Sequence, residues 1–523
     1  MERLFINGRS GYILTENIIC LQVGNANWAE KYTIPNHVEW LYMNNQAANQ
    51  EILEQMQVSK KKYDVLLLTD VSDLELYDDL LDMLDYYTII YDSTKKINVK
   101  LKKQLDKKMS FSIPLTSPKK VIDDIATYFY HGQYGLRILP ENLAVSNSYS
   151  GEFYRLGSHE VVFEGNFGEN FCYLLSWRDH NYSLADIQKK TELFLEHQIE
   201  GDVEIQLVLS EINQYTGAVQ KIITFSQSNL QDAVEYGPKM EKNHVYNYQL
   251  FVKGAGKLHL GALHLRFSRG KYGSFILGGQ RTADSMGHEL IAFFYPGDYR
   301  PPLCVYFGGV REAEGFEGYY MMKKLNVPFL LFEDLGLKGG AFYRGTTEYK
   351  DMIIKKIKDT LSYLGFSNEQ LILSGMSMGT HACLYYANDL QPHSVVINKP
   401  LVNLNQVAKN QIIKAPQIFP PILDVESYLA KHMELQKSNG IDEEFWQHFD
   451  DDTLNNTQFY IVYMINDDYD DVIFDQLRDR FLQLKKVITY KAIPGRHNDN
   501  NVISTGTFFK YYSLVINKHF RHE

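Results

Sequence analysis

The chain has 523 residues, of which 45% are hydrophobic and 22% are charged. That composition is ordinary for globular proteins, so it excludes widespread disorder and, at this length, favours about two to four domains. The 64 acidic residues outnumber the 53 basic residues, for a net charge of -11. Because no dense basic run breaks that balance, nucleic acid is a poor candidate for a partner.

The sequence shows no targeting or membrane-spanning segment. Residues 1–9 lack the apolar stretch of a secretory signal. Apolar runs such as 65–68 and 327–332 are far shorter than the ~20 residues that cross a bilayer. We therefore expect a cytoplasmic protein without a membrane span.

The four cysteines predict neither a metal site nor a redox site. Cys20, Cys172, Cys304 and Cys383 lie far apart and lack the paired spacing of a zinc site or a thiol–disulfide motif. We expect buried free thiols.

Residues 1–145 contain one clear α/β unit. Residues 63–70 have the apolar run of a buried strand, residues 73–86 have the periodicity of a helix, and residues 87–91 have the pattern of the next strand. These elements predict a Rossmann-like α/β segment. No G-x-G-x-x-G follows any of its strands, so we expect a scaffold and not a dinucleotide site.

Residues 146–270 change to short strands with alternating apolar and polar residues. The runs lie at 161–163, 171–175, 203–210, 220–224, 246–253 and 257–267. Their spacing predicts a β-sandwich, for which carbohydrate binding is one interpretation by fold-level analogy alone. The leucines of the last run do not keep one parity, so we predict a β-bulge near Gly261. Half-exposed strand positions explain His259 and His264 better than metal ligation does, since no other ligand lies nearby in the sequence.

Residues 271–523 alternate between strands and helices. Predicted strands lie at 290–295, 303–307, 329–332, 370–374, 394–398, 459–465 and 487–490, and predicted helices at 348–364, 378–388, 472–484 and 502–518. This alternation predicts a parallel sheet covered on both faces, as in an α/β-hydrolase-type catalytic domain. The irregular stretch at about 402–456 is long enough to form a helical lid.

A G-x-S-x-G sequence centred on Ser377 lies directly between a predicted buried strand and a predicted helix. That context is typical of a nucleophile elbow, in which the glycines let strand and helix approach each other. A structural turn is the alternative interpretation. As a nucleophile, Ser377 would have the Met378 N–H beside it as an oxyanion donor at the helix N-terminus. His381, on the same helix, is expected to pack and not to act as the base.

A second oxyanion donor is predicted in the loop after the strand at 303–307. Gly308 and Gly309 follow that strand, and paired glycines allow the backbone to approach a substrate carbonyl. The match to lipase-type loops is partial, because Phe307 stands where those loops have a histidine. A tight turn at the strand end is the alternative.

The acid and the base are expected after the last two strands, because this fold supplies its triad in the order Ser, acid, His. His497 is the one histidine among 16 in a glycine-bearing loop after the last strand. Asp467 is the preferred acid, followed by Asp468 and then Asp470, whereas Asp471 is placed in solvent at a helix start. No metal is needed for this chemistry.

Three short segments are similar to a known family. Residues 374–380 (SGMSMGT), 398–403 (NKPLVN) and 494–497 (PGRH) resemble the second accessory secretory protein family of the accessory Sec system. The similarity extends over the whole chain.

The resemblance implies a triad of Ser377, Asp467 and His497 that O-acetylates N-acetylglucosamine on a glycosylated serine-rich-repeat adhesin. It further implies that the protein acts together with two other accessory secretory proteins and an accessory SecA motor. The implied location is the cytoplasm, at the inner face of the membrane. The family can carry glutamate as the acid, whereas this sequence offers only aspartates.

Acyl transfer and ester hydrolysis use the same nucleophile, base and oxyanion hole, so a carbohydrate esterase or deacetylase remains the alternative enzyme. A mainly non-catalytic export adapter or chaperone is the alternative from another class. No bound cofactor is expected, but the reaction requires an acetyl donor, which the sequence does not identify.

Overall fold

The computed structural model describes residues 17–521, apart from 45–62, 71–79, 82, 178–187, 415, 417–418, 434–439, 450–453, 455, 484–485 and 487. The chain forms two compact units. One comprises Met1–Gly132 and Arg269–Tyr272, and the other comprises Gln133–Ser268 and Gly273–Glu523. The second unit therefore contains both the antiparallel segment and the hydrolase-type segment. The domain boundaries predicted at 145 and 270 stay a prediction.

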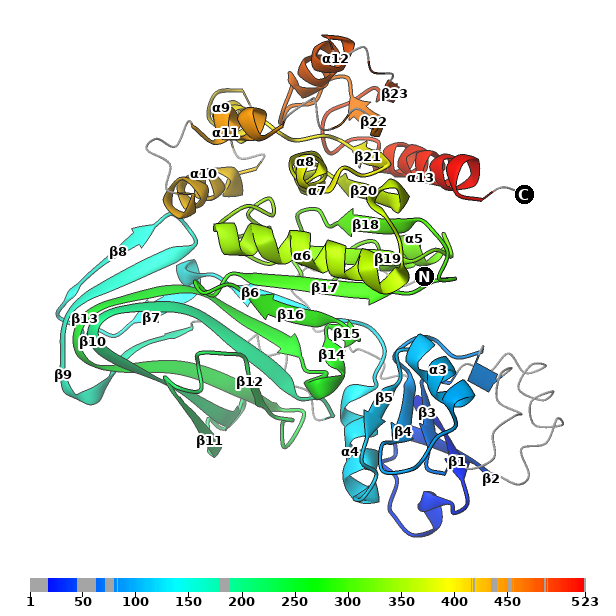
Figure 1. The fold of residues 1–523 in the computed structure, drawn as a ribbon. Coiled ribbons are helices and arrows are strands. Elements are labelled where there is room, and N and C mark those ends of the chain that lie inside the picture. The colour runs from blue at the N-terminus through cyan, green and yellow to red at the C-terminus, as the bar shows by residue number, and fades with distance from the viewer. Residues whose placement is uncertain are drawn as a thin grey trace. The chain divides into compact units, whose positions relative to one another are not determined.

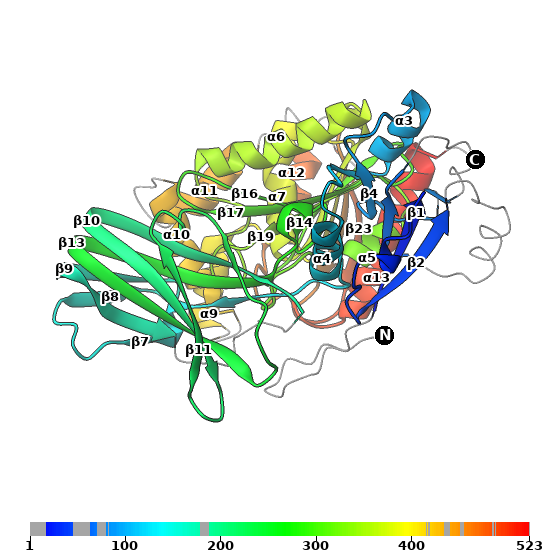
Figure 2. The ribbon, with the colours of Figure 1, turned by 90° about the horizontal axis from the view of Figure 1, so that it is seen from below.

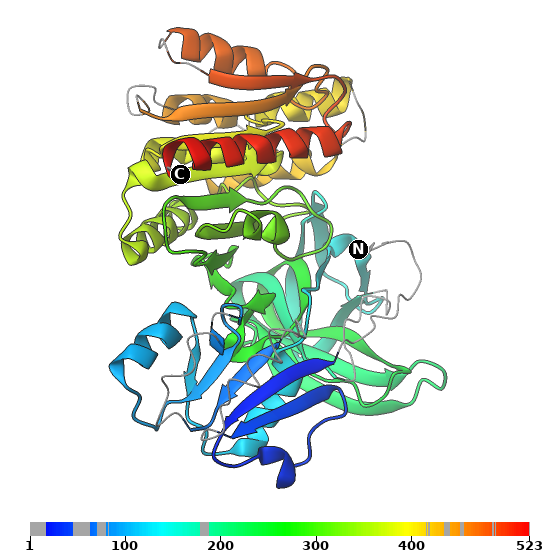
Figure 3. The ribbon, with the colours of Figure 1, turned by 90° about the vertical axis from the view of Figure 1, so that its right-hand side faces the viewer.

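The first unit has a five-stranded parallel sheet in the order β2-β1-β3-β4-β5 (Figure 3, blue strands). Its strands are β1 (Ile18–Gly24), β2 (Val38–Asn44), β3 (Val65–Leu68), β4 (Ile89–Asp92) and β5 (Phe111–Ile113), and its helices include α3 (Val99–Lys107) and α4 (Pro118–Tyr128). Every residue of β3 and β4 is buried, as a sheet covered on both faces requires. The Rossmann-like prediction is confirmed, with β3 and β4 as the two predicted strands. The helix predicted at 73–86 falls mainly outside the described residues.

The second unit begins with an eight-stranded antiparallel sheet whose central path is β11-β10-β13-β9-β7 (Figure 1). β12 pairs with β10, β6 pairs with β13 and β8 pairs with β9. The strands are β6 (Gly135–Ile138), β7 (Leu143–Val145), β8 (Glu152–Leu156), β9 (Glu160–Trp177), β10 (Thr191–Asn213), β11 (Val219–Ser226), β12 (Val234–Tyr236) and β13 (His244–Phe267). The antiparallel strands of the predicted β-sandwich are confirmed, but they belong to one hydrogen-bonded sheet and not to two separate sheets.

Glycines let β13 run through what the sequence pattern divided into two strands, at 246–253 and 257–267. Gly254 has a φ of +91° and Gly256 a φ of +143°, and a Cβ at either position would collide with a carbonyl oxygen of β10. The strand can bend at these residues because glycine has no Cβ. Its pairing with β10 continues through both of them.

A β-bulge lies in the same strand pair. Two residues of β13, Gly261 and Ala262, stand opposite the single residue Glu196 of β10. Glu196 Oε2 accepts the Ala262 N–H at 2.9 Å, which satisfies an amide that the bulge has taken out of the ladder. The bulge predicted near Gly261 is confirmed.

The second unit also contains an eight-stranded sheet in the order β16-β17-β19-β18-β20-β21-β22-β23. Its strands are β16 (Gln280–Ala283), β17 (Glu289–Tyr295), β18 (Leu303–Phe307), β19 (Phe329–Asp334), β20 (Leu371–Met376), β21 (Ser394–Asn398), β22 (Gln458–Met464) and β23 (Ile488–Ile493), and β14 (Gly273–Ser274) and β15 (Ile276–Leu277) form a small separate pair. Strands β18 to β23 run parallel, and β16 and β17 form an antiparallel edge. This is the strand order of the α/β-hydrolase fold, so the predicted fold class is confirmed. The short strand β16 was not predicted, because its residues are mostly polar and exposed.

Helices cover both faces of this sheet, and Figure 2 shows α6 and α13 on opposite sides of it. The helices are α5 (Tyr319–Lys323), α6 (Thr347–Leu364), α7 (Met378–Tyr385), α8 (Ala387–Leu390), α12 (Ile473–Gln483) and α13 (Asn501–His519). Helix α6 begins where the Thr346 side chain accepts the Tyr349 N–H and ends at Gly365, which has a φ of +71°. The single helix predicted at 378–388 is divided into α7 and α8 at Tyr386. No helix among the described residues has the length and apolar character needed to cross a membrane.

Three helices occupy the stretch for which we predicted a lid: α9 (Leu404–Ile413), α10 (Pro421–His432) and α11 (Gly440–His448). This insertion contacts the loop after β22 at Tyr469. Asn410 Nδ2 donates to the Tyr469 carbonyl at 2.8 Å, and the rings of Phe419 and Tyr469 stack with centroids 5.5 Å apart. The insertion thus packs beside the acidic loop, and its role as a lid stays a prediction.

Candidate active site

Ser377 lies at the sharp turn between β20 and α7. Its backbone has a φ of 50° and a ψ of -119°, a conformation that costs energy for any residue with a Cβ. The flanking glycines make this turn possible: a Cβ on Gly375 would collide with the backbone of Gly379, and a Cβ on Gly379 would collide with the carbonyl of Phe307. The structure therefore gives the G-x-S-x-G spacing a steric reason, and it has the geometry of a nucleophile elbow.

Ser377, His497 and Asp467 form a continuous hydrogen-bonded series. The Ser377 Oγ and the His497 Nε2 are 2.9 Å apart, and the His497 Nδ1 and the Asp467 Oδ2 are also 2.9 Å apart. Each residue follows the carboxyl end of a strand, β20, β22 or β23, and parallel strands bring those ends to one edge of the sheet. His497 is only 2% exposed. The arrangement suits proton transfer from the serine hydroxyl to the imidazole.

Three neighbours fix the orientation of His497. The ring of Tyr469 stacks on the imidazole, with centroids 4.3 Å apart and an interplanar angle of 5°. The backbone N–H of His497 donates to Asp468 Oδ1 at 3.0 Å. The Nζ of Lys399 donates to the His497 carbonyl and, at 2.6 Å, to Asn501 Oδ1. These contacts hold both the ring and the backbone of His497 in place.

The clustered aspartates have different partners. Asp467 alone faces the imidazole, and its second carboxylate oxygen accepts the Tyr469 N–H at 2.9 Å. Asp468 binds the His497 backbone instead of the ring. Asp470 is buried and accepts the backbone N–H groups of residues 402 and 403, and burial raises its pKa to about 7. Neither alternative acid contacts the imidazole.

Asp471 is exposed and stands directly before α12, as predicted. Its carboxylate nevertheless has two partners. Its carboxylate pairs with Lys414 Nζ at 2.6 Å and accepts Asn410 Nδ2 at 2.9 Å. Asp471 therefore attaches α9 to the start of α12.

The predicted second oxyanion donors are already engaged. The Gly308 N–H donates to the Phe332 carbonyl at 3.1 Å, and the Gly309 N–H donates to Glu317 Oε2 at 2.6 Å. The loop is nevertheless close to the serine, since a Cβ on Gly309 would lie 4.0 Å from the Ser377 Cβ. In this conformation neither amide is available to a substrate oxygen, which corrects the prediction. The Met378 N–H, at the start of α7, stays the predicted donor.

Two glutamates, Glu317 and Glu333, hold the Gly308–Gly309 loop, and no sequence motif indicates their role. Glu317 Oε2 also accepts the Tyr306 hydroxyl at 3.2 Å, and the Glu317 N–H donates to Glu333 Oε1. Burial, and then the nearby Glu317 charge, raise the pKa of Glu333 well above its usual range. Glu317 thus holds the loop through the Gly309 N–H, and Glu333 supports Glu317 from behind.

His381 is a buried packing residue, in agreement with its predicted role. Its Nε2 accepts from Arg344 Nη1 at 3.0 Å, and burial and that guanidinium lower the pKa of His381 well below its usual range. Arg344 also pairs with Glu444 of α11. Arg344 thus links α7 to the 402–456 insertion.

One strand histidine and one cysteine differ from expectation. His264 is fully buried and not half-exposed, and Glu314 and Glu196 pair with its two ring nitrogens. His259 is half-buried, as expected, and pairs with Glu160. All four cysteines are free thiols, but Cys172 is exposed. No group of three or more His, Cys, Asp or Glu residues in the described part of the chain is arranged to hold a metal ion.

Comparison with known proteins gives consistent matches over nearly the whole chain. The sequence profile of a family described as accessory Sec system GspB-transporter matches residues 18–522. An accessory Sec system protein of Streptococcus gordonii is 31% identical over 506 residues, which cover 96% of this chain and 98% of that protein. One of Staphylococcus aureus is 36% identical over 392 residues, which cover 75% of this chain and 74% of that protein. Among solved structures, a chain of a glycosylation-associated protein complex from Streptococcus agalactiae is similar with a TM-score of 0.90 at 34% identity, covering 97% of this chain and 100% of that chain.

Proposed function

The chain belongs to the accessory Sec system GspB-transporter family, and from that premise we propose that it is a serine-dependent O-acetyltransferase. Its acceptor is N-acetylglucosamine on a glycosylated serine-rich-repeat adhesin, whose export it supports. The observation that carries the proposal is the hydrogen-bonded series of Ser377, His497 and Asp467. A serine held in a strained backbone conformation against a buried histidine suits a nucleophile and serves no purpose in a scaffold.

In the first half-reaction Ser377 Oγ attacks the carbonyl carbon of the acetyl donor, and His497 Nε2 takes the hydroxyl proton. Asp467 accepts the His497 Nδ1–H, which fixes the tautomer and stabilises the imidazolium. The tetrahedral oxyanion is stabilised by the Met378 N–H at the start of α7. When the bond to the leaving group breaks, His497 returns the proton to that group, and the acetyl group remains on Ser377.

In the second half-reaction a sugar hydroxyl attacks the acetyl carbon of the acyl-serine. His497 takes the proton of that hydroxyl and delivers it to Ser377 Oγ as the serine leaves. The net reaction moves one acetyl group from donor to sugar and restores the enzyme. The only co-reactant is the acetyl donor, and no bound cofactor takes part.

Transfer to a sugar has to compete with hydrolysis by water. A hydroxyl held in line with the acyl-serine can reach an effective molarity of ~10⁵ M or more, and exclusion of water favours it further. The insertion of α9, α10 and α11 packs beside the loop that carries Asp467. It is the segment that we propose as the lid.

The partners follow from the same proposal. The similar Streptococcus agalactiae chain was solved as part of a complex, which supports assembly with two other accessory secretory proteins. We place the enzyme in the cytoplasm, peripherally at the export site on the inner face of the membrane, where an accessory SecA motor receives the modified adhesin.

Two alternatives make different predictions from the same structure. An esterase or deacetylase would use the same three residues with water as the acceptor. An export adapter or chaperone would bind the adhesin without needing Ser377 at all.

Co-expression with a glycosylated serine-rich client separates these functions. Mass spectrometry of the released glycans should show acetyl groups added to N-acetylglucosamine by the wild-type enzyme and none added by Ser377→Ala. A variant at an exposed position far from the site, Gln220→Ala on β11, is the matched control and should acetylate normally. Unmodified glycans together with removal of acetyl groups from a pre-acetylated client would identify a deacetylase. If the client is exported normally with Ser377→Ala, and neither the wild type nor any variant acetylates it, the protein is an adapter.

A further inference from the structure

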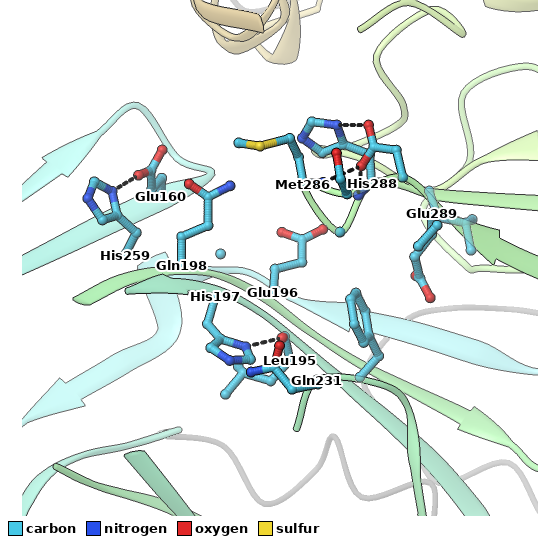
Figure 4. Close-up of a pocket in the computed structure, with 18 of the residues that line it drawn as sticks. Glu160, Leu195, Glu196, His197, Gln198, Gln231, His259, Met286, His288 and Glu289 are labelled. Atoms are coloured by element: carbon cyan, nitrogen blue, oxygen red, sulfur yellow. Dashed lines mark hydrogen bonds and ion pairs between the residues drawn. The ribbon is translucent and has the colours of Figure 1, made fainter. Parts of the chain in front are cut away.

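A cavity of about 870 Å³ lies where β10 faces α10 and the turn between β16 and β17 (Figure 4). Its volume is in the range of small-molecule and cofactor sites, ~300–1,000 Å³. Both parts of the second unit contribute walls, since the lining runs from residue 159 to residue 432. None of Ser377, His497 and Asp467 lines it.

The charged side chains that line this cavity are already paired. Glu160 binds Lys431 at 3.4 Å and Arg281 binds Glu289. Asp284 is hydrogen-bonded to the His288 ring at 2.9 Å and accepts the Thr346 hydroxyl at 2.6 Å. Glu196 pairs with His264, and Asp232 pairs with Arg281. Because each charge has a partner, the cavity offers no unpaired charge to a phosphate, a carboxylate or a cation. A neutral ligand fits these walls better than an ion.

Two histidines at the cavity add neutral hydrogen-bonding groups. His197 Nδ1 is 2.9 Å from the Leu195 carbonyl, so Nδ1 donates and Nε2 is an acceptor. Burial lowers the pKa of His197. Burial, and then the neighbouring His288, lower the pKa of His432 to about 4. Both rings are therefore uncharged at neutral pH.

Two amide side chains are also left free to bind a ligand. Gln198 points into the cavity between Glu160 and Glu196 (Figure 4). Neither Gln198 nor Gln231 makes a side-chain hydrogen bond to another residue in the described ranges. An amide presents two donors and one acceptor, which matches the hydroxyl and acetamido groups of a sugar.

Apolar side chains form the rest of the wall. Phe194 and Tyr428 are both buried and line the cavity with Met286 and Leu337. The C–H faces of a pyranose pack against aromatic and aliphatic surface, while its hydroxyl groups need amides and imidazoles at the rim. The cavity supplies both kinds of surface.

We propose that this cavity is a second saccharide site, which binds a neutral sugar of the glycoprotein while another sugar of the same molecule reaches Ser377. The identity of the glycoprotein rests on the proposed function. The binding of a neutral saccharide rests on the cavity alone. A repetitive acceptor carries many sugars, so holding one raises the local concentration of the others at the serine.

The backbone connects this cavity to the nucleophile. Residues 335–337 line the cavity, and the chain then continues to Gly339 and Gly340. A Cβ on Gly339 would contact Val310, and a Cβ on Gly340 would contact the sulfur of Met378. The segment that forms one cavity wall therefore continues into glycines that pack directly against residues beside Ser377.

Binding to the Ser377→Ala protein tests the site without turnover. The probe is a serine-rich peptide that carries N-acetylglucosamine, measured by isothermal titration calorimetry. Gln198→Trp, which removes the amide and places a bulky ring in the cavity, should weaken binding of this probe at least about tenfold. The matched control is Gln220→Trp on the exposed surface of β11, which should leave Kd unchanged. Gln198→Ala is the smaller second variant, for use if the tryptophan lowers the melting temperature.

The same substitution in the active enzyme should separate positioning from chemistry. With Ser377 intact, Gln198→Trp should raise KM for the glycosylated client about tenfold and leave hydrolysis of a small activated acetyl ester unchanged. The ester needs only the residues at Ser377, so it reports on the integrity of the catalytic site.

Three outcomes decide the proposal. Equal binding of the unglycosylated peptide would overturn it, because the cavity would then hold peptide and not sugar. Unchanged Kd and KM in Gln198→Trp would overturn it while acetyl transfer, and hence the proposed function, stands. Loss of probe binding in Gln198→Trp, with no acetyl transfer by the wild type, would leave the saccharide site standing and remove the acetyltransferase function.

Discussion

The two large sheets of the second unit bring their polar residues together in different ways. In the parallel sheet, Ser377, Asp467 and His497 each follow the carboxyl end of a strand, and the topology alone delivers them to one edge. In the antiparallel sheet, the cavity is assembled from mid-strand residues such as Gln198, a hairpin turn and helix α10. The candidate catalytic residues thus stand in loops at the ends of strands. The proposed binding surface is instead formed by side chains on the face of a strand and by segments that are distant in the sequence.

The two regions also differ in how their charges are used. At the edge near Ser377, a buried imidazole is aligned by Asp467, Tyr469 and a lysine on its carbonyl. At the cavity, carboxylates and bases neutralise each other and leave amides free. If acetyl transfer takes place at Ser377 and the sugar is bound in the cavity, substitutions near Ser377 should lower the transfer rate, and substitutions in the cavity should weaken binding of the glycosylated client.

The largest effect is expected from Ser377→Ala. Removal of the nucleophile removes the covalent route, so acetyl transfer should fall by a factor of ~10⁶. The far-ultraviolet spectrum and client binding should not change, because the hydroxyl supports no other described contact. Assay of glycan acetylation with purified protein checks this, and wild-type activity in the alanine variant would remove Ser377 from the mechanism.

The next effect distinguishes adjacent aspartates. Asp467→Asn should lower the transfer rate by ~10⁴, since an asparagine would hold the wrong histidine tautomer. Asp468→Asn should cost far less, because Asp468 accepts only a backbone N–H of His497 and the amide oxygen of asparagine can replace it. Single-turnover rates of both variants measure the difference. Greater sensitivity of Asp468 would mean that a different carboxylate orients the base.

A smaller effect is expected at the Gly308–Gly309 loop. Glu317→Gln keeps an acceptor for the Gly309 N–H but removes a negative charge near the position where the oxyanion develops. Hydrolysis of a small acetyl ester should therefore rise, by about tenfold or less. Glu312→Gln, an exposed residue of the same loop, is the control and should behave as the wild type. A large loss of activity in Glu317→Gln would instead show that the charge is needed to shape the loop.

The smallest effect concerns stability away from the site. Burial alone would lower the pKa of His264, but Glu314 and Glu196 raise it to about 9. Because the pKa in the folded state lies above the unfolded value of about 6.5, this ion pair stabilises the protein fully below about pH 6.5 and loses its contribution as pH rises through about 9.

Differential scanning calorimetry between these pH values should show a fall in melting temperature of a few degrees. His264→Gln should be less stable at low pH and should lose this part of the pH dependence. The same pH profile in both proteins would contradict the assignment of the charge to His264.

Sequence patterns predicted the hydrolase sheet well, because buried strands of a parallel sheet are short continuous apolar runs. The predicted strands at 303–307 and 394–398 have the bounds of β18 and β21. The site residues Ser377, Asp467 and His497 were identifiable because each stands in a loop directly after such a run. Their catalytic roles remain the proposal that the experiments test.

Features that depend on distant pairing were not predictable. Glu333 has the sequence context of a strand residue, and nothing local indicates that it supports Glu317 beneath the Gly308–Gly309 loop. His264 was expected to be half-exposed, but its partner Glu314 lies 50 residues later. The bend of β13 depends on glycines whose neighbours in β10 are also far away in sequence.

The central claim is that Ser377 is an activated nucleophile, and covalent trapping tests it most directly. A fluorophosphonate should label the native protein, and mass mapping of the digest should place a single adduct on Ser377. The rate of labelling should fall strongly in His497→Ala, because the serine then lacks its base. An adduct at another serine, or no adduct on Ser377 in a protein that still transfers acetyl groups, would contradict the account.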